Sequence, residues 1–137
     1  MPGDNEDRMT APPVSVLIVD DQAPFRGAAR AVLALAPGFE ALAEATSGEA
    51  AVAMAAELAP DLVLMDIHLP GISGLEATRR ILRARPGTVV VLLSTYRAAD
   101  LPDVADGCGA AAYVHKEDFD PGVLRALWDQ HAGGRGR

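Results

Sequence analysis

Two apolar stretches of the sequence are each followed directly by acidic residues, and this placement could support chemistry. Asp20 and Asp21 follow the run Val16 to Val19, and Asp66 follows Leu62 to Met65. A proline and two glycines come soon after Asp66, so a buried strand is expected to deliver this carboxylate to an exposed loop. Open α/β sheets bind their ligands at the carboxyl ends of their strands. The sequence therefore predicts three carboxylates at one sheet edge.

Ser94 and Lys116 also stand at or just beyond the ends of expected strands, so they join the acids if the strands are parallel. Neighbouring strands lie about 4.8 Å apart, and carboxylates on adjacent strands therefore repel and raise each other's pKa. A divalent cation offsets this repulsion, and Mg²⁺ prefers oxygen ligands such as carboxylates, a backbone carbonyl and a phosphoryl oxygen. A lysine and a hydroxyl would hold the remaining phosphoryl oxygens. Such a set of groups is suited to forming an aspartyl phosphate.

Apolar periodicity and glycine or proline breaks divide the chain into alternating strands and helices. Strands are predicted at 14–19, 39–45, 62–65, 88–93 and 110–114, and helices at 23–35, 50–58, 75–85 and 123–131. The segment 96–109 contains Pro102, Gly107 and Gly109, so any helix there is expected to be short and weakly held. The alternation predicts an α/β, doubly wound fold, with a five-stranded parallel sheet covered by helices on both faces.

Length, charge and cysteine content narrow the class of protein. A chain of 137 residues suits one domain, predicted at 14–131 between flexible tails at 1–13 and 132–137. The net charge of −7 and the scattered basic residues argue against direct nucleic-acid binding. The single cysteine, Cys108, excludes an internal disulfide and fits a small buried residue in a reducing compartment. Without a secretory signal or a long apolar run, the protein is expected to be cytoplasmic, with no membrane contact.

Four short segments carry a more specific pattern than composition does. They are Val19-Asp20-Asp21, Met65-Asp66-Ile67-His68-Leu69-Pro70 with Gly74 beyond it, Leu93-Ser94-Thr95-Tyr96, and Tyr113-Val114-His115-Lys116. In type, order and spacing they resemble the receiver domain of two-component response regulators. The resemblance covers about residues 14–131, nearly the whole chain. Motif matches gain weight from such a shared context, whereas any one of these segments alone would be weak.

The resemblance implies a phosphoacceptor and a metal site. Asp66 would be the phosphoacceptor, with Asp21, Asp66 and the backbone carbonyl of His68 as direct Mg²⁺ ligands, and Asp20 binding through water. The donor would be a histidine kinase or a phosphotransfer protein. The chain would then be no enzyme in the usual sense, but a phosphoprotein that assists its own phosphorylation and dephosphorylation. The implied strand order is 2-1-3-4-5, as in flavodoxin.

The resemblance also implies a switch and an output. Ser94 and Lys116 would bind the phosphoryl group, and Ser94 and Tyr113 would form the switch pair, although ordinary packing explains a buried Tyr113 equally well. Signalling would proceed through a downstream protein partner or self-association. The chain departs from the family at Glu117, where many receivers have proline, so the cis peptide often found there is not assumed. Pro102 and the nearby glycines likewise predict an unusually short fourth helix.

Several alternatives remain beside this interpretation. A phosphatase of the haloacid-dehalogenase type needs a second acid two residues after the nucleophile, where this chain has His68, and residues 20–24 form no P-loop. A stronger rival is a receiver-like interaction module that is not phosphorylated. The chain could also be the first part of a DNA-binding response regulator, although a stand-alone receiver is favoured. His68 and His115 lack the spacing of a zinc site, so loop or surface roles are expected for them.

Overall fold

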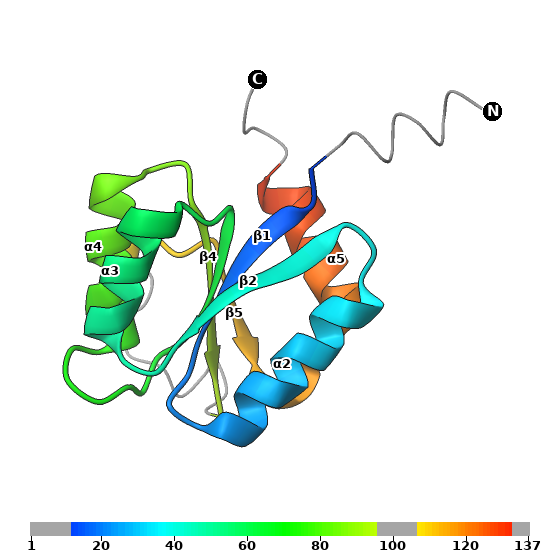
Figure 1. The fold of residues 1–137 in the computed structure, drawn as a ribbon, viewed down its shortest axis with the longest axis horizontal. Coiled ribbons are helices and arrows are strands. Elements are labelled where there is room, and N and C mark those ends of the chain that lie inside the picture. Colours follow the sequence, from blue (N-terminus) through cyan, green and yellow to red (C-terminus); the bar gives the residue numbers. More distant parts are fainter. Residues whose placement is uncertain (1–11, 96–106, 133–137) are drawn as a thin grey trace.

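The computed structural model describes residues 12–95 and 107–132 of the protein. Five strands form one parallel sheet in the order β2-β1-β3-β4-β5 (Figure 1), so the predicted fold class and strand order are confirmed. The strands are β1 (Val14–Val19), β2 (Phe39–Ala45), β3 (Leu62–Asp66), β4 (Val89–Ser94) and β5 (Ala112–His115). The helices are α2 (Ala23–Leu35), α3 (Gly48–Leu58), α4 (Gly74–Ala84), the 3₁₀ turn η3 (Lys116–Asp118) and α5 (Pro121–His131).

Helices cover both faces of the sheet, with α3 and α4 on one side and α2 and α5 on the other (Figure 1). Alternate residues of β1 point to opposite faces. Val16 and Ile18 pack with α2 and α5, and Leu17 and Val19 pack with α3 and α4. Because both faces of β1 are covered, its apolar run is nearly continuous rather than alternating, which is the feature that made the strand recognisable in the sequence.

Most predicted element bounds agree with the structure to within two residues, and polar caps account for several helix starts. The side chain of Ser47 accepts a hydrogen bond from the Ala50 N–H, so α3 begins at Gly48 rather than at the predicted residue 50. Ser73 and Asp120 cap α4 and α5 in the same way. The final strand begins at Ala112, two residues later than predicted. Among the described residues, no helix has the length and apolar character that a membrane span requires.

Strand β2 forms one edge of the sheet and is only partly buried, as its alanine-rich sequence predicted. Its pairing with β1 slips by one residue between Val16 and Leu17, opposite Leu42, which is partly exposed.

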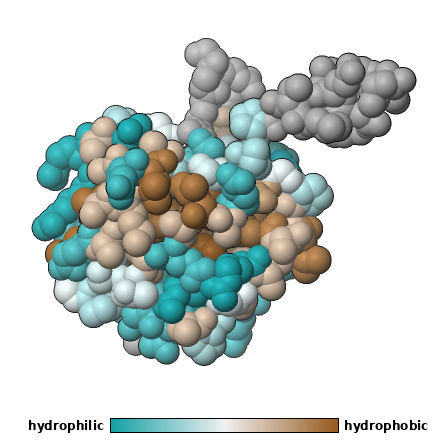
Figure 2. All heavy atoms as spheres, viewed as in Figure 1, coloured by the Kyte–Doolittle hydropathy of each residue, from teal (hydrophilic) through white to brown (hydrophobic). Residues whose placement is uncertain are grey.

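Figure 2 shows hydrophobic residues on the viewed face of the molecule, above a hydrophilic lower part. Residues 96–106 of the predicted weak segment 96–109 are not among the described residues, whereas Cys108 is buried as predicted.

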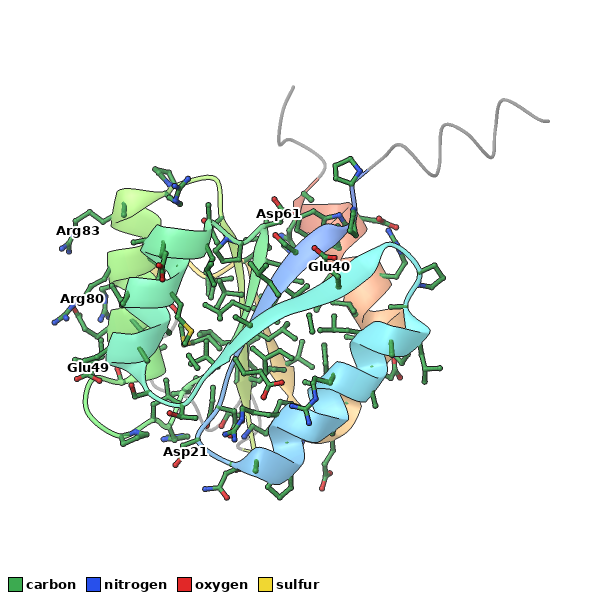
Figure 3. All side chains as sticks on the ribbon, in the orientation of Figure 1. Asp21, Glu40, Glu49, Asp61, Arg80 and Arg83 are labelled. Carbon is green, nitrogen blue, oxygen red and sulfur yellow. The ribbon has the colours of Figure 1, made fainter. Side chains whose placement is uncertain are left out.

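A polar contact at the amino end of the sheet links the central strand β3 to its neighbour β1. Asp61 accepts hydrogen bonds from the Ser15 backbone N–H at 3.0 Å and from the Ser15 hydroxyl at 3.2 Å. This contact joins the starts of β1 and β3, and Val19 consequently lies opposite Met65 at their other ends. In Figure 3, Asp61 and Asp21 lie at opposite ends of the sheet. The residues that follow β1 therefore reach the same edge as Asp66.

Candidate functional site

The three predicted carboxylates meet at the carboxyl edge of the sheet. Asp20 and Asp21 follow β1, and Asp66 is the last residue of β3. One carboxylate oxygen from each lies within 4.8 Å of the others. Asp20 and Asp66 are buried, and Asp21 is exposed. The cluster therefore has a buried floor and one acid that faces solvent.

Lys116 brings a positive charge into this cluster. Its Nζ lies 2.6 Å from Oδ2 of Asp20 and 3.7 Å from Oδ2 of Asp66, and its side chain is only 13% exposed. Oδ2 of Asp20 is buried, and the ion pair with the lysine ammonium compensates its charge. The ammonium also lies over the ring of Phe25, 4.6 Å from the centroid. The Phe25 ring and the Asp20 carboxylate thus hold the lysine ammonium beside Asp66.

The pKa of Asp66 depends on its burial and on the charged groups around it. Burial, followed by the nearby charge of Asp20, raises the pKa of the Asp66 carboxyl, while Lys116 and a hydrogen bond from the His68 backbone N–H act in the opposite direction. That hydrogen bond is 3.2 Å long and ends on Oδ1. Desolvation and a like charge both disfavour the ionised form. A cation that joined the cluster would relieve both effects.

The remaining predicted residues lie around the same edge. Ser94 is the buried last residue of β4, one position beyond Leu93, which pairs with Asp66 in the sheet. Tyr113 lies on β5 and packs against the core under α3 and α4. Its hydroxyl is buried and has no hydrogen-bond partner within residues 12–95 and 107–132. Tyr96 belongs to the segment outside the described residues.

Arg26 supports the acidic turn and was not anticipated from the sequence. Its Nη1 donates a 2.8 Å hydrogen bond to the backbone carbonyl of Asp20, and its Nε pairs with Glu44 on β2 at 3.1 Å. Arg30, one turn later on α2, pairs with the same glutamate. An arginine in the first turns of a helix after an acidic pair is the available sequence signal, but its side-chain direction cannot be read from spacing.

The loop after Asp66 is held at both ends by close contacts. The Ile72 N–H donates to Oε2 of Glu49 at 3.1 Å, and the Gly74 N–H donates to the Ile67 carbonyl at 2.9 Å. In Figure 3, Glu49 lies at the end of α3 nearest this edge. Gly74 begins α4 so close to the strand that an added Cβ would lie 2.1 Å from the carbonyl oxygen of Asp66. Only glycine fits there, and the loop carrying the His68 carbonyl is positioned by this approach.

The donor set fits a hard divalent cation. Three carboxylates, two of them buried and one exposed, supply negative charge and oxygen atoms in the combination that Mg²⁺ prefers. A lysine beside the same carboxylates can interact with an anionic group that approaches them. The fold and this edge therefore define a doubly wound α/β protein with a cluster of acidic residues and a lysine at the carboxyl ends of its strands.

Comparisons with known proteins agree with this description. The family model described as "Response regulator receiver domain" matches residues 16–128. The response regulator GacA of Pseudomonas aeruginosa is 37% identical over 122 residues, covering 89% of this chain and 57% of GacA. The crystal structure of a LuxR-family two-component response regulator from Aurantimonas sp. superposes with a TM-score of 0.78 at 30% identity, covering 88% of this chain and 86% of the other.

The response regulator domain of Thermotoga maritima CheB gives a TM-score of 0.78 at 28% identity, covering 88% of this chain and 97% of that one. The chain belongs to the receiver domain family of response regulators, whose members act in two-component signalling as phosphoacceptors rather than as conventional enzymes. It spans about half the length of the curated relatives that it matches.

Proposed function

We propose that this receiver accepts a phosphoryl group on Asp66 from a histidine kinase or a phosphotransfer protein in the cytoplasm. The observation that supports this most directly is the position of Lys116, whose ammonium lies between Asp20 and Asp66 in a largely buried site. Asp66 lies 3.7 Å from the lysine ammonium and pairs with Leu93 of β4, so its carboxylate is close to both the amine and the end of that strand. A carboxylate with an adjacent cation can act as a nucleophile towards phosphorus.

The proposed transfer moves one phosphoryl group to Asp66, and the negative charge on its oxygen atoms must be stabilised by neighbouring side chains. A carboxylate oxygen of Asp66 attacks phosphorus, the bond from phosphorus to the donor nitrogen breaks, and the donor imidazole recovers a proton. Lys116 leaves Asp20 and binds a phosphoryl oxygen, and the Ser94 hydroxyl donates to another. Asp21, Asp66 and the His68 carbonyl would hold Mg²⁺ directly and Asp20 would hold it through water, and the bound ion would supply positive charge to the transferring group.

The output is proposed to pass through Ser94 and Tyr113. Movement of Ser94 towards the phosphoryl group vacates space beside β5, and the Tyr113 hydroxyl, buried without a partner among the described residues, is free to change its packing. The changed surface would then contact a downstream protein or a second copy of the chain. Relatives such as the transcriptional regulatory protein DegU of Brevibacillus brevis indicate gene regulation as the wider setting for this proposal.

The test is phosphorylation of the purified chain by a small phosphodonor with and without Mg²⁺, read by intact mass. We expect the mass of one phosphoryl group on the wild type, none on Asp66→Asn, and none on Asp21→Ala, which removes a proposed metal ligand. Calorimetry should show weaker Mg²⁺ binding to Asp21→Ala. A wild type that binds partners but takes up no phosphate would instead identify the rival class, an interaction module that has lost phosphorylation.

A further inference from the structure

The His115 side chain lies at the end of β5, immediately before Lys116, and is only 10% exposed. Its Nε2 is 2.7 Å from the backbone carbonyl oxygen of Thr95. Its Nδ1 accepts a hydrogen bond of 3.2 Å from the backbone N–H of Glu117. A carbonyl can only accept and a backbone N–H can only donate. The two contacts together therefore assign the neutral tautomer with the proton on Nε2.

The imidazole connects two segments that both belong to the proposed phosphorylation site. Ser94 pairs with His115 at the last position of the ladder between β4 and β5, and Thr95 is the next residue. The contact from Nε2 extends the connection between the strands one residue past the ladder. On the other side, the contact to Nδ1 caps η3, the turn that begins with Lys116. One ring thus bonds to the residue after Ser94 and to the residue after Lys116.

We propose that His115 is a positioning residue for Lys116 and Ser94, an inference that rests on the phosphoryl-binding role proposed for those two side chains. A lysine side chain has four rotatable bonds, so its ammonium keeps a fixed place only if the backbone that carries it is also fixed. His115 holds that backbone on both sides of the lysine Cα, through its own place in β5 and through Glu117. The same ring holds the backbone next to Ser94.

The main-chain N–H of Glu117, rather than its carboxylate, is the partner that matters. The carboxylate lies 4.0 Å from Nδ1 on a side chain that is 78% exposed, where solvent screens the interaction. The N–H exists because this position is not proline, the residue that many receivers have there, and proline has no N–H to donate. His115 and Glu117 therefore function together in this chain: the histidine supplies an acceptor, and the glutamate position supplies the donor.

The test uses the full chain with three substitutions at residue 115. His115→Leu removes both hydrogen bonds, His115→Asn places an oxygen near the position of Nδ1, and His115→Gln places a nitrogen near the position of Nε2. In metal-free protein, hydrogen exchange at the Glu117 amide should be slow in the wild type and Asn variant, and about tenfold faster in the Leu and Gln variants. His131→Leu, at the end of α5, is the matched control and should change nothing.

Phosphorylation of the same proteins by acetyl phosphate with Mg²⁺ gives the functional measurement. We expect the rate to fall about three- to tenfold in His115→Leu and by less in the two amides, with similar urea stability among the three variants. A Leu variant that is phosphorylated at the wild-type rate overturns the proposal. The proposal is also overturned if the phosphorylation rate falls equally in all three variants and in proportion to their loss of urea stability, because the role of His115 would then be structural only. A wild type that takes up no phosphate refutes the proposed function itself, which is a different result.

Discussion

Gly74→Ala is expected to disturb the candidate phosphoacceptor without touching a charged group. Gly74 is the first residue of α4, and its N–H donates to the carbonyl of Ile67, just after the strand that ends at Asp66. A Cβ at this position would lie 2.1 Å from the Asp66 carbonyl oxygen and 2.9 Å from the Ile67 Cα. A comfortable approach of carbon to oxygen is about 3.3 Å or more. The start of α4 and the end of β3 must therefore separate by about 1 Å.

Because the atoms in the way belong to the backbone, no side-chain rotation relieves the clash. Overpacking of this kind costs about 3 kcal/mol at the upper end of its usual range. The weakened hydrogen bond to Ile67 costs about 1 kcal/mol more, and replacing glycine by alanine in a helix returns about 1 kcal/mol. The net loss in the free energy of unfolding is about 3 kcal/mol, which a domain of ordinary stability survives. A carboxylate displaced by about 1 Å would react about a hundredfold more slowly.

Urea denaturation and phosphorylation by a small phosphodonor measure the two effects separately. Gly122→Ala is the matched control, since it places the same methyl group in the first turn of α5, where the nearest atom would be 3.4 Å away. The control should match the wild type or gain up to about 1 kcal/mol. If both variants showed the same stability and the same phosphorylation rate, the close approach at Gly74 would not be what positions Asp66.

Three further predictions follow from contacts around the acids. Because burial and a neighbouring carboxylate raise the pKa of Asp66, the wild type should lose stability as the pH rises through that pKa. Asp66→Asn should therefore be the more stable protein at pH 7, with its advantage shrinking as the pH falls towards the ordinary value of 3.8, and a less stable Asn variant at pH 7 would contradict this. Arg26→Ala should lower the free energy of unfolding by about 2 kcal/mol, because its charged hydrogen bond to the acidic turn is partly buried. Arg30→Ala, whose side chain is 52% exposed, should lower it by under about 1 kcal/mol, and equal losses in urea denaturation would argue against the special role of Arg26. Phe25→Leu should slow phosphodonor labelling about two- to fivefold by removing the ring under Lys116, and an unchanged rate would mean that the ring does not hold the amine.

The sheet and its acidic edge could be predicted because they depend on residue type and order alone. Continuous apolar runs indicated buried parallel strands, and β1 and β2 have the predicted bounds. Once strands are parallel, residues that follow them must share an edge, so the meeting of Asp20, Asp21 and Asp66 followed without any knowledge of side-chain directions. The one-residue slip opposite Leu42 was not predictable, because a bulge changes neither composition nor the average apolar period.

Contacts that orient the site depend on pairs of residues that are ordinary when taken singly. His115 has no metal-site spacing, which led to the expectation of a loop or surface role. Glu117, taken alone, shows only that the proline of many receivers is absent after the lysine. Their relation becomes visible only when η3 brings the Glu117 N–H to Nδ1 of His115. A hydrogen bond of this kind contributes about 1 kcal/mol, too little to affect the choice of fold but enough to change a rate several-fold. Departures from a family pattern are therefore most informative when they are considered together, since one substitution can supply the partner that another requires.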